Sequence, residues 1–557
     1  MTQSCIAPPV GKFSLRHPGW LSAALITFVI IGFHFYFLAH AGGLWRDEVN
    51  FLNVARRHSL AEMARDSFPL FMPLAVKFFC AAGFGQAEIY LRLLGIFIGL
   101  GCVAGLWAAA WQSRRSPPLI SLVLFGLNST MISFGDSLRP YGLGCLFVIF
   151  TMAGIWFFLK QTSWPRAGLV AVLAVLSVQT LFHDAVLIGA ACLGTVAVCL
   201  RRKDWLAAFK ILLAGAVAAL SLAPYLGNFF DGRESTAVLH TGVSWLRFFN
   251  DLATDLGFPW RPYMFVWALL ALVVLVLGFC GFFKPRPVPE TSGALTQDEP
   301  YLFAATTLLL SVGGFLLFLR LTGMPGQPWY FLPLMALTAM CFDMIVPALP
   351  GLVRCVLLGG LLATTIISIP VCRRDLNYRF TNIDDWSHSL AKTAAREDFI
   401  IVTPWFYGIT FDHYFHGTTN WSTLPPLPDH ATHRYDLVRG ELQKSGVMRP
   451  VLDQAGIALQ SGHRVWLLAP AGVLRIPAPG TPPPPDLPPA PLPDTGWSDE
   501  PYSVAWTFQA MQFLSDHSRS FVLVSNPGTS QHTAENMELF LAQGWHESGS
   551  ATNSNAK

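Results

Sequence analysis

The sequence has few charged residues and none of the usual nucleotide-binding motifs. Asp, Glu, Lys and Arg make up 13% of its 557 residues, about half the share of roughly 25% in soluble globular domains. A P-loop, a dinucleotide-binding glycine pattern and a nucleophile elbow are all absent from the sequence. The low charge content favours a membrane protein, and the missing motifs disfavour chemistry that needs a bound nucleotide.

The basic and sulfur-containing residues exclude two further classes. The net charge of +3 comes from scattered clusters that form no single patch, so no nucleic-acid partner is indicated. No Cys follows Cys372, so the C-terminal part cannot contain a disulfide. We interpret the other cysteines as small buried hydrophobic residues.

Long apolar segments are what the sequence has in abundance. Hydrophobic residues make up 53% of the chain, and the mean hydropathy is +0.45. Helices of about 20 apolar residues cross the roughly 30 Å of bilayer hydrocarbon. We therefore predict about eleven transmembrane helices, at 20–40, 89–111, 118–134, 142–159, 167–182, 185–200, 206–224, 262–283, 301–321, 329–347 and 354–371.

The basic residues predict the orientation, because cytoplasmic loops carry an excess of Lys and Arg. They fall on alternate connections, which places the N-terminus in the cytoplasm and everything after Cys372 outside; they are Lys12, Arg16, Arg114, Arg115, Lys160, Arg166, Arg201, Arg202, Lys203, Lys284, Arg286 and Arg354. The first outer loop, 41–88, is an exception with several Arg residues. The sequence "AHA" at 39–41 resembles a signal-peptidase site, but the apolar run before it is too long for a signal peptide, so we expect an uncleaved anchor.

Two domains are expected. Residues 1–371 form the polytopic α-helical membrane domain, and 372–557 form a soluble α/β domain in the periplasm. Within the latter we predict strands at 398–404, 463–470 and 520–526, and helices at 434–447, 501–516 and 533–543. The proline run at 476–496 reads as a stiff, solvated excursion that need not pack.

The first outer loop is expected to hold two short helices at the membrane surface. Apolar residues recur at helical spacing from Val49 to Ala55, and "SLAE" at 59–62 is a capping-box pattern that begins a second helix. Regular structure is expected to stop at "DSFPLFMP", residues 66–73.

Charged residues occupy three turns on the predicted outer face. The first is "WRDEVNF" with Arg46, Asp47 and Glu48. A carboxylate inside the bilayer costs roughly 2.5–3.5 kcal/mol, so these acids must lie at the interface or in a wet cavity. They are either a helix cap or reactive groups.

The other two turns are "GDSLRPYG" and "LFHDAVL". The first, 135–142, carries Asp136, Arg139 and Tyr141, and by itself it reads as a capped turn with an Asp–Arg pair. The second, 181–187, carries His183 and Asp184, and a lone His near a helix end is usually structural. Three charged turns on one face nevertheless favour a functional site.

Metal binding stays an open alternative. Oxygen and nitrogen ligands are available at the three turns, in Asp47, Glu48, Asp136, His183 and Asp184, but no spaced metal motif appears. No cofactor is certain on this interpretation, and a divalent metal is left open. The aromatic stretch "PWFYGITFDHYFHG", 404–417, offers rings for sugar stacking, although we interpret it first as core or membrane-contacting surface.

Taken in order, these motifs resemble those of the GT-C membrane glycosyltransferases that use polyprenyl-phosphate sugars, including protein O-mannosyltransferases and lipid A aminoarabinose transferases. The resemblance rests on "WRDEVNF", "FPLFMPLAVKFF", "GQAEIYLRLLGIFIGL", "GDSLRPYGL" and "LFHDAVLIG" within residues 20–200, with an echo at "GQPWYFLPLMAL". Ser67-Phe68-Pro69 departs from the family's His-Pro-Pro, and Trp329 stands where the family often has Arg.

The resemblance implies a GT-C-like arrangement and transfer of a sugar, by inversion, from a polyprenyl-phosphate donor to a lipid, glycan or protein acceptor at the outer face of a bacterial inner membrane. Asp47 is the expected base, with Glu48 orienting it or the acceptor. Arg139 and His183 are expected at the leaving phosphate, with Arg46 and Arg92 behind them.

Supporting roles are expected for Asp136, Tyr141, Asp184 and Tyr330. Two other functions stay open. A transporter or flippase of lipid-linked sugars also needs many spans and charges within them. A non-catalytic scaffold of envelope assembly would leave the carboxylates dispensable.

Overall fold

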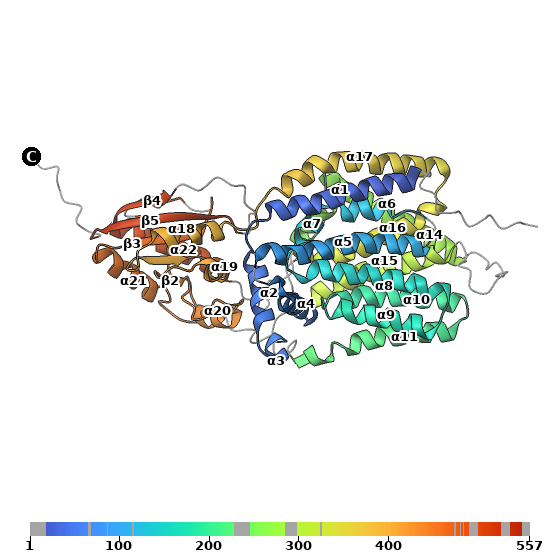
Figure 1. Ribbon diagram of the computed structural model, residues 1–557, viewed down its shortest axis with the longest axis horizontal. Coiled ribbons are helices and arrows are strands. Elements are labelled where there is room, and N and C mark those ends of the chain that lie inside the picture. Colours follow the sequence, from blue (N-terminus) through green and yellow to red (C-terminus); the bar gives the residue numbers. More distant parts are fainter. Residues whose placement is uncertain are drawn as a thin grey trace, which may run out of the picture.

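Figure 1 shows the computed structural model as a helical bundle with a small sheet domain at one end. The structure describes residues 18–64, 68–85, 87–113, 116–227, 245–283, 298–322, 326–472, 475–478, 481–482, 484–489, 499–524 and 535–547. This arrangement confirms the predicted fold class, a polytopic helical protein with a C-terminal α/β domain.

Nine helices in these ranges are long and apolar enough to cross a membrane. Their α-helical parts are α1 (Pro18–His40), α5 (Glu88–Ser113), α8 (Pro140–Lys160), α10 (Asp184–Arg201), α11 (Trp205–Leu220), α14 (Met264–Phe283), α15 (Glu299–Thr322), α16 (Leu332–Ile345) and α17 (Gly351–Asp375). Short 3₁₀ turns flank some of them, namely η3 (Ala223–Tyr225), η4 (Arg261–Tyr263), η5 (Pro328–Phe331) and η6 (Val346–Ala348). The amphipathic α13 (Trp245–Leu256) precedes α14.

Two of the eleven expected spans are shorter or interrupted. The segment expected at 118–134 is divided into α6 (Leu119–Ser121), the π-helical η2 (Leu122–Gly126) and α7 (Ser129–Gly135). A new helix starts there because the Asn128 side chain accepts a hydrogen bond from the backbone N–H of Thr130. The segment expected at 167–182 is the 15-residue α9 (Trp164–Val178).

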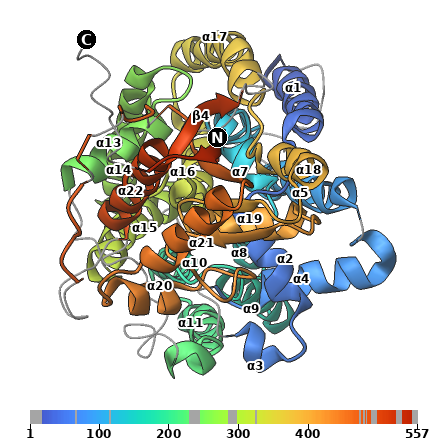
Figure 2. The same cartoon turned by 90° about the vertical axis from the view of Figure 1, so that its left-hand side faces the viewer.

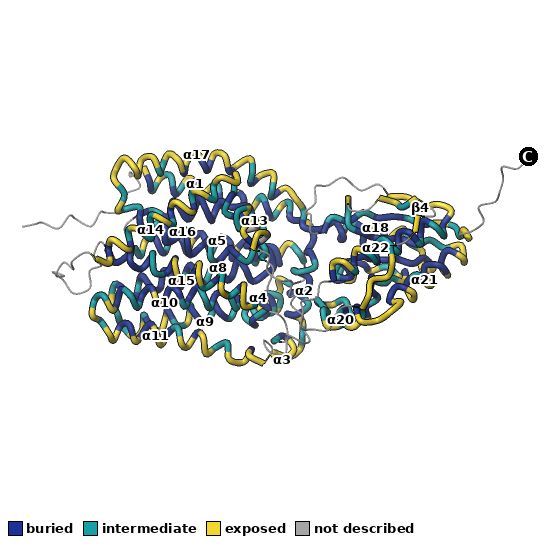
Figure 3. Tube along the Cα trace, turned by 180° about the vertical axis from the view of Figure 1, so that it is seen from behind, coloured by how far each residue is buried: buried dark blue, intermediate teal, exposed yellow. Residues whose placement is uncertain are grey.

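Burial differs strongly between the helices of the bundle. Figure 3 shows α8 mostly buried, whereas α17 and α11 expose long stretches. The exposed side chains on the outer helices are large and apolar, as at Phe28, Leu213 and Val356. Such a surface suits contact with lipid and fits the membrane assignment.

The first outer loop forms the two expected helices, α2 (Arg46–Arg56) and α3 (Leu60–Met63), and two further helical segments that were not expected, α4 (Phe71–Phe79) and the π-turn η1 (Cys80–Phe84). Ser59 caps α3 by accepting a hydrogen bond from the N–H of Glu62 at 3.2 Å. Pro73 lies in the first turn of α4, so the proline segment begins a helix after the break. Ser67 lies outside the described residues.

The sheet domain has a mixed five-stranded sheet in the order β2-β1-β3-β5-β4. β1 is parallel to β2 and β3, whereas β5 is antiparallel to β3 and β4. The strands are β1 (Phe399–Val402), β2 (Asn420–Thr423), β3 (Arg464–Pro470), β4 (Ser518–Val524) and β5 (Met537–Trp545). The helices are α18 (Ile383–Thr393), α19 (Tyr407–Tyr414), α20 (Tyr435–Leu442), α21 (Arg449–Gln460) and α22 (Glu500–His517).

Both faces of this sheet are covered. Ile401 and Leu467 face a core built with α20, α21 and α22, and Ile400 and Leu468 face one built with α18 and α19. The aromatic stretch 404–417 is mostly core, as interpreted first: Trp405, Tyr407, Phe411, Tyr414 and Phe415 are buried.

One prediction for this domain needs correction. The expected helix at 533–543 is wrong, because Met537–Trp545 forms β5 and pairs on both sides. The described residues of the proline run are mostly exposed, and two hydrogen bonds attach the run to α22: the amide of Gln509 and the hydroxyl of Tyr502 donate to the carbonyls of Pro484 and Pro488 at 3.0 and 2.7 Å. Its residues 479, 480, 483 and 490–496 lie outside the described residues.

Contacts of the first outer loop hold the sheet domain against the bundle, with α2 close to α19 (Figure 2). The Tyr414 hydroxyl accepts a hydrogen bond from the N–H of Leu44 at 2.7 Å and donates one to Glu88. The Asn53 amide donates to the carbonyl of Ala431 at 2.7 Å. The N-terminus of α2 is therefore enclosed between the two parts.

Candidate active site

Glu48 anchors the start of α2. Its side chain is fully buried, and its Oε1 accepts hydrogen bonds from Nη1 of Arg92 at 2.5 Å and from the N–H of Leu138 at 2.8 Å. Its Oε2 accepts one from the N–H of Trp45 at 3.3 Å. Glu48 thus joins α2, α5 and the turn after α7, which makes it a positioning residue.

Arg92 completes this anchor. It is 5% exposed, and its Nη2 donates to the carbonyl of Gly43 at 2.7 Å and to that of Gly42 at 3.4 Å. Its charge is balanced by Glu48 within the protein. The structure therefore places Arg92 beneath the loop and not beside Asp47.

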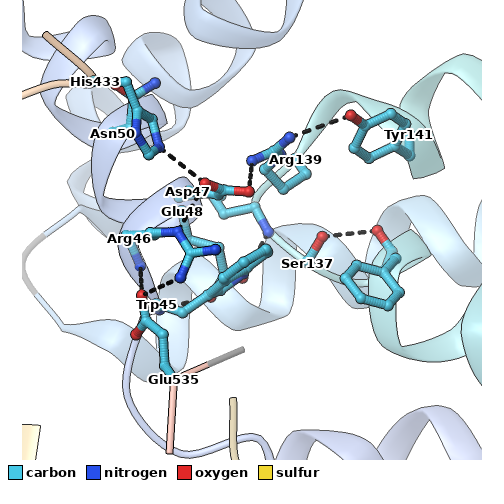
Figure 4. A network of polar contacts seen from close by, with 12 residues as sticks. Trp45, Arg46, Asp47, Glu48, Asn50, Ser137, Arg139, Tyr141, His433 and Glu535 are labelled. Carbon is cyan, nitrogen blue, oxygen red and sulfur yellow. Dashed lines mark hydrogen bonds and ion pairs between the residues drawn. The ribbon is translucent and has the colours of Figure 1, made fainter. Parts of the chain in front are cut away.

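Asp47 lies between three basic side chains, as Figure 4 shows. It forms an ion pair with Nη1 of Arg139, and its Oδ1 lies 2.9 Å from Nε2 of His433 and 3.8 Å from Nε of Arg46. Burial opposes ionisation of this carboxyl, but Arg139, His433 and Arg46 outweigh it and hold the pKa of Asp47 well below its usual range. Asp47 is therefore a carboxylate at neutral pH.

Arg139 is buried among aromatic rings. Its guanidinium carbon lies 5.2–5.8 Å from the ring centroids of Tyr141, Phe68, Phe51 and Trp45, which stabilises a cation away from bulk water. Its Nη2 donates to the Tyr141 hydroxyl at 3.2 Å. Its Nε has no hydrogen-bond partner among the described residues, so donor capacity is left for an anion.

Arg46 connects the site to the sheet domain. Its guanidinium lies 4.7 Å from the ring centroid of Phe406, and its Nη1 lies 3.5 Å from Oε1 of Glu535. The backbone N–H of Arg46 also donates to Glu535 at 2.9 Å. Burial raises the pKa of Glu535 to about 7, although Arg46 opposes the shift.

Sequence reasoning missed His433 and Glu535. They lie 386 and 489 residues from their partners in α2, and neither belongs to a spaced motif. His433 comes from "DHATHRYD", 429–436, whose two His and adjacent charges were a weak signal in an otherwise ordinary loop.

Rings link Arg139 to the third charged turn. The ring centroids of Tyr141 and Tyr330 are 5.8 Å apart, and those of Tyr330 and His183 are 6.4 Å apart. Nε2 of His183 has no hydrogen-bond partner among the described residues. Asp184 is buried and accepts a hydrogen bond from the Ser177 hydroxyl at 2.9 Å.

Asp136 lies apart from this row. The expected Asp–Arg pair within its turn does not form, because Asp136 instead lies 2.6 Å from Nδ1 of His34 on α1, while Arg139 pairs with Asp47. Trp329, which stands where an Arg was expected, packs on Phe134 with ring centroids 4.6 Å apart.

The candidate metal ligands do not gather. Among the residues that the structure describes, no group of three or more His, Cys, Asp or Glu side chains could hold a metal ion. Asp47, Glu48, Asp136 and Asp184 each have separate partners.

Comparison with known proteins gave matches among solved structures alone. No family model and no curated protein sequence matches the chain. The structure is similar to ArnT from Cupriavidus metallidurans bound to undecaprenyl phosphate, at 13% identity and a TM-score of 0.49, over 94% of this chain and 98% of that one.

It is also similar to the oligosaccharyltransferase of Archaeoglobus fulgidus. The form with Zn and sulfate aligns at 11% identity and a TM-score of 0.43, over 80% of this chain and 67% of that one. The form tethered to an acceptor peptide aligns at 11% identity and a TM-score of 0.40, over 82% and 70%. These TM-scores all lie below 0.5, so the likenesses assign no function to the side chains described above.

Proposed function

We propose that this protein is an integral membrane glycosyltransferase that moves a sugar from a polyprenyl-phosphate-linked donor to a hydroxyl of an envelope acceptor. The observation that carries the proposal is the pair of Asp47 and Arg139, which lies between the bundle and the sheet domain. It places an ionised carboxylate beside a buried cation at a membrane surface.

Each partner of this pair suits one half of the reaction. An acceptor hydroxyl is a weak nucleophile at neutral pH and must lose its proton as the new bond forms. Asp47 supplies the negative charge on which that proton removal depends. The departing lipid phosphate gains negative charge, which Arg139 stabilises through its planar set of N–H donors.

Further side chains beside Arg139 could contact the lipid phosphate. Tyr141, Tyr330 and His183 continue from Arg139 toward the start of α10. In this proposal their polar atoms hold the phosphate, while the prenyl chain stays in the bilayer beside the apolar helices. Glu48 and Arg92 hold the loop that carries Asp47 in a fixed position relative to the turn that carries Arg139.

The expected product has the inverted configuration, because a single displacement needs one group to remove a proton and no covalent sugar intermediate. The reaction would take place on the membrane side that carries the sheet domain. We propose that this side is the periplasm of a bacterial inner membrane, with the N-terminus in the cytoplasm, as the basic residues predict.

Reconstitution in vesicles tests the proposal. The wild-type chain is supplied with a polyprenyl-phosphate sugar and an acceptor with free hydroxyls, and release of the sugar from the lipid is measured. Asp47→Asn should lower turnover by ~10²–10⁴-fold, the usual contribution of a positioned proton-transfer group. Asp436→Asn, at a partly exposed carboxylate on α20, is the matched control and should keep wild-type turnover.

Two results would overturn the proposal. Equal turnover by wild type and Asp47→Asn, at equal amounts of folded protein, would remove Asp47 from the reaction. Movement of the lipid-linked sugar across the bilayer with its glycosyl phosphate bond intact would favour the flippase.

A further inference from the structure

His433 is fixed on α2 at two points. Its backbone N–H donates to Oδ1 of Asn50 at 3.0 Å, and its ring Nε2 lies 2.9 Å from Oδ1 of Asp47. The ring stacks on Tyr435 with centroids 5.6 Å apart and planes 12° apart, and it meets Trp405 edge-on at 6.1 Å. The position and plane of the imidazole are therefore set by both parts of the protein.

The partner of Nε2 decides where the ring carries its hydrogen. Asp47 is ionised and accepts hydrogen bonds only, so Nε2 of His433 must be the donor. In the neutral ring, Nδ1 then carries a lone pair. Nδ1 is itself buried and has no hydrogen-bond partner among the described residues, whereas other atoms of the side chain leave it 18% exposed. Its lone pair is thus unused within the described protein and is available to a hydroxyl group that comes to lie against the ring when the site is filled.

Asp47 itself is poorly suited to hold a proton. Its carboxylate is stabilised by Arg139 and Arg46 in addition to His433, and a base works best when its pKa is near the working pH. A neutral imidazole instead carries a lone pair on one ring nitrogen that can accept a proton. An aspartate behind a histidine holds the required tautomer and stabilises the imidazolium that forms.

We propose that His433 is the catalytic base of the glycosyl transfer and that Asp47 acts through it as a positioning residue. This inference rests on the proposed function. The acceptor hydroxyl gives its proton to Nδ1 of His433 while its oxygen forms the new bond to the anomeric carbon of the sugar. The bond from that carbon to the phosphate oxygen breaks, and the electron pair leaves with the polyprenyl phosphate.

Substitution of His433 separates this role from a structural one. In His433→Gln the side-chain amide still donates a hydrogen bond to Asp47 but cannot take a proton. We expect the reconstituted full chain to lose ~10²–10⁴-fold in kcat while binding of the lipid-linked donor is unchanged. His430→Gln is the matched control, because His430 belongs to the same segment but packs on Trp421 at 4.6 Å.

Two further readouts identify the base. The charged and titratable groups around the ring are Asp47, with Arg46 and Arg139 behind it, and Tyr435. The acid limb of the wild-type kcat/KM profile should disappear in His433→Gln. Added imidazole should restore turnover to His433→Gly, since it supplies the missing base and a structural defect would not respond.

The outcomes distinguish this inference from the proposed function. Sugar transfer by wild type together with wild-type kcat in His433→Gln would overturn the role of His433 and leave the glycosyltransferase intact. A slow His433→Gln that keeps the acid limb, with no rescue of His433→Gly by imidazole, would also overturn it. Absence of transfer by the wild type itself would count against the proposed function.

Discussion

Replacing Glu48 by Gln tests the anchor beneath the site. Gln keeps the shape of the side chain but removes its charge, so the buried cation of Arg92 is left with uncharged acceptors only, among them the carbonyls of Gly42 and Gly43. Removing one partner of a buried ion pair costs about 3–5 kcal/mol. Because Glu48 also holds the N–H of Leu138, next to Arg139, sugar transfer should fall together with stability.

Heating in detergent measures this loss. The wild type and Glu48→Gln are heated in steps, and the temperature at which half of each remains monodisperse is recorded. A clear decrease is expected for Glu48→Gln. The control is Glu441→Gln, which breaks the pair with Lys444, whose side chain is 62% exposed. Surface pairs contribute about 0–1 kcal/mol, so its curve should overlay that of the wild type.

A double-mutant cycle tests whether the pair of Glu48 and Arg92 anchors the loop. Arg92→Met alone should lower heat stability as much as Glu48→Gln, since each variant leaves one buried charge without its partner. The double variant Glu48→Gln/Arg92→Met leaves no unpaired charge, so its loss of heat stability should be smaller than the sum of the losses of the two single variants. Additive losses, or a Glu48→Gln variant as stable as the wild type, would show that the pair does not anchor the loop.

Two further predictions concern the domain contact and the helix packing. Burial raises the pKa of Glu535 from 4.5 to about 7. The contribution of Glu535 to stability is therefore present below about pH 4.5 and is lost as the pH rises through about 7. Between about pH 5 and 8 the wild type should lose more heat stability than Glu535→Gln, and equal losses in the two proteins would contradict this. In Gly95→Ala the new Cβ would lie 1.8 Å from the carbonyl oxygen of Asp136, whereas at Gly189 nothing lies within 4 Å. The yield of folded protein should therefore fall for Gly95→Ala and not for Gly189→Ala, and equal yields would refute the close packing.

Most of the fold could be predicted from local sequence. Apolar length located the long helices, and the buried strands β1 and β3 are short apolar runs between turns. The segment that became β5 was read as a helix because "MELFLAQGW" has apolar residues at spacings that suit both structures. Its pairing with β3 and β4 decides between them, and those partners are distant in the sequence.

The candidate site was predictable only in part. Charged turns between apolar runs pointed to Asp47 and Arg139, since a charged residue near a bilayer is costly and usually has a functional role. Charge did not distinguish His433 and Glu535 from their neighbours, because charged residues are common in a soluble domain. The partner of Asp136 was missed for a related reason: His34 lies inside an apolar helix and reads as an isolated polar residue.

The contact between Asp47 and His433 also has a consequence for biosynthesis. The two residues are 386 positions apart, so the ribosome makes Asp47 and inserts the bundle long before His433 exists. Until the sheet domain has been made and folded, the nascent chain holds a carboxylate and a cation without the imidazole. A chain interrupted before residue 433 would occupy the membrane without this dyad.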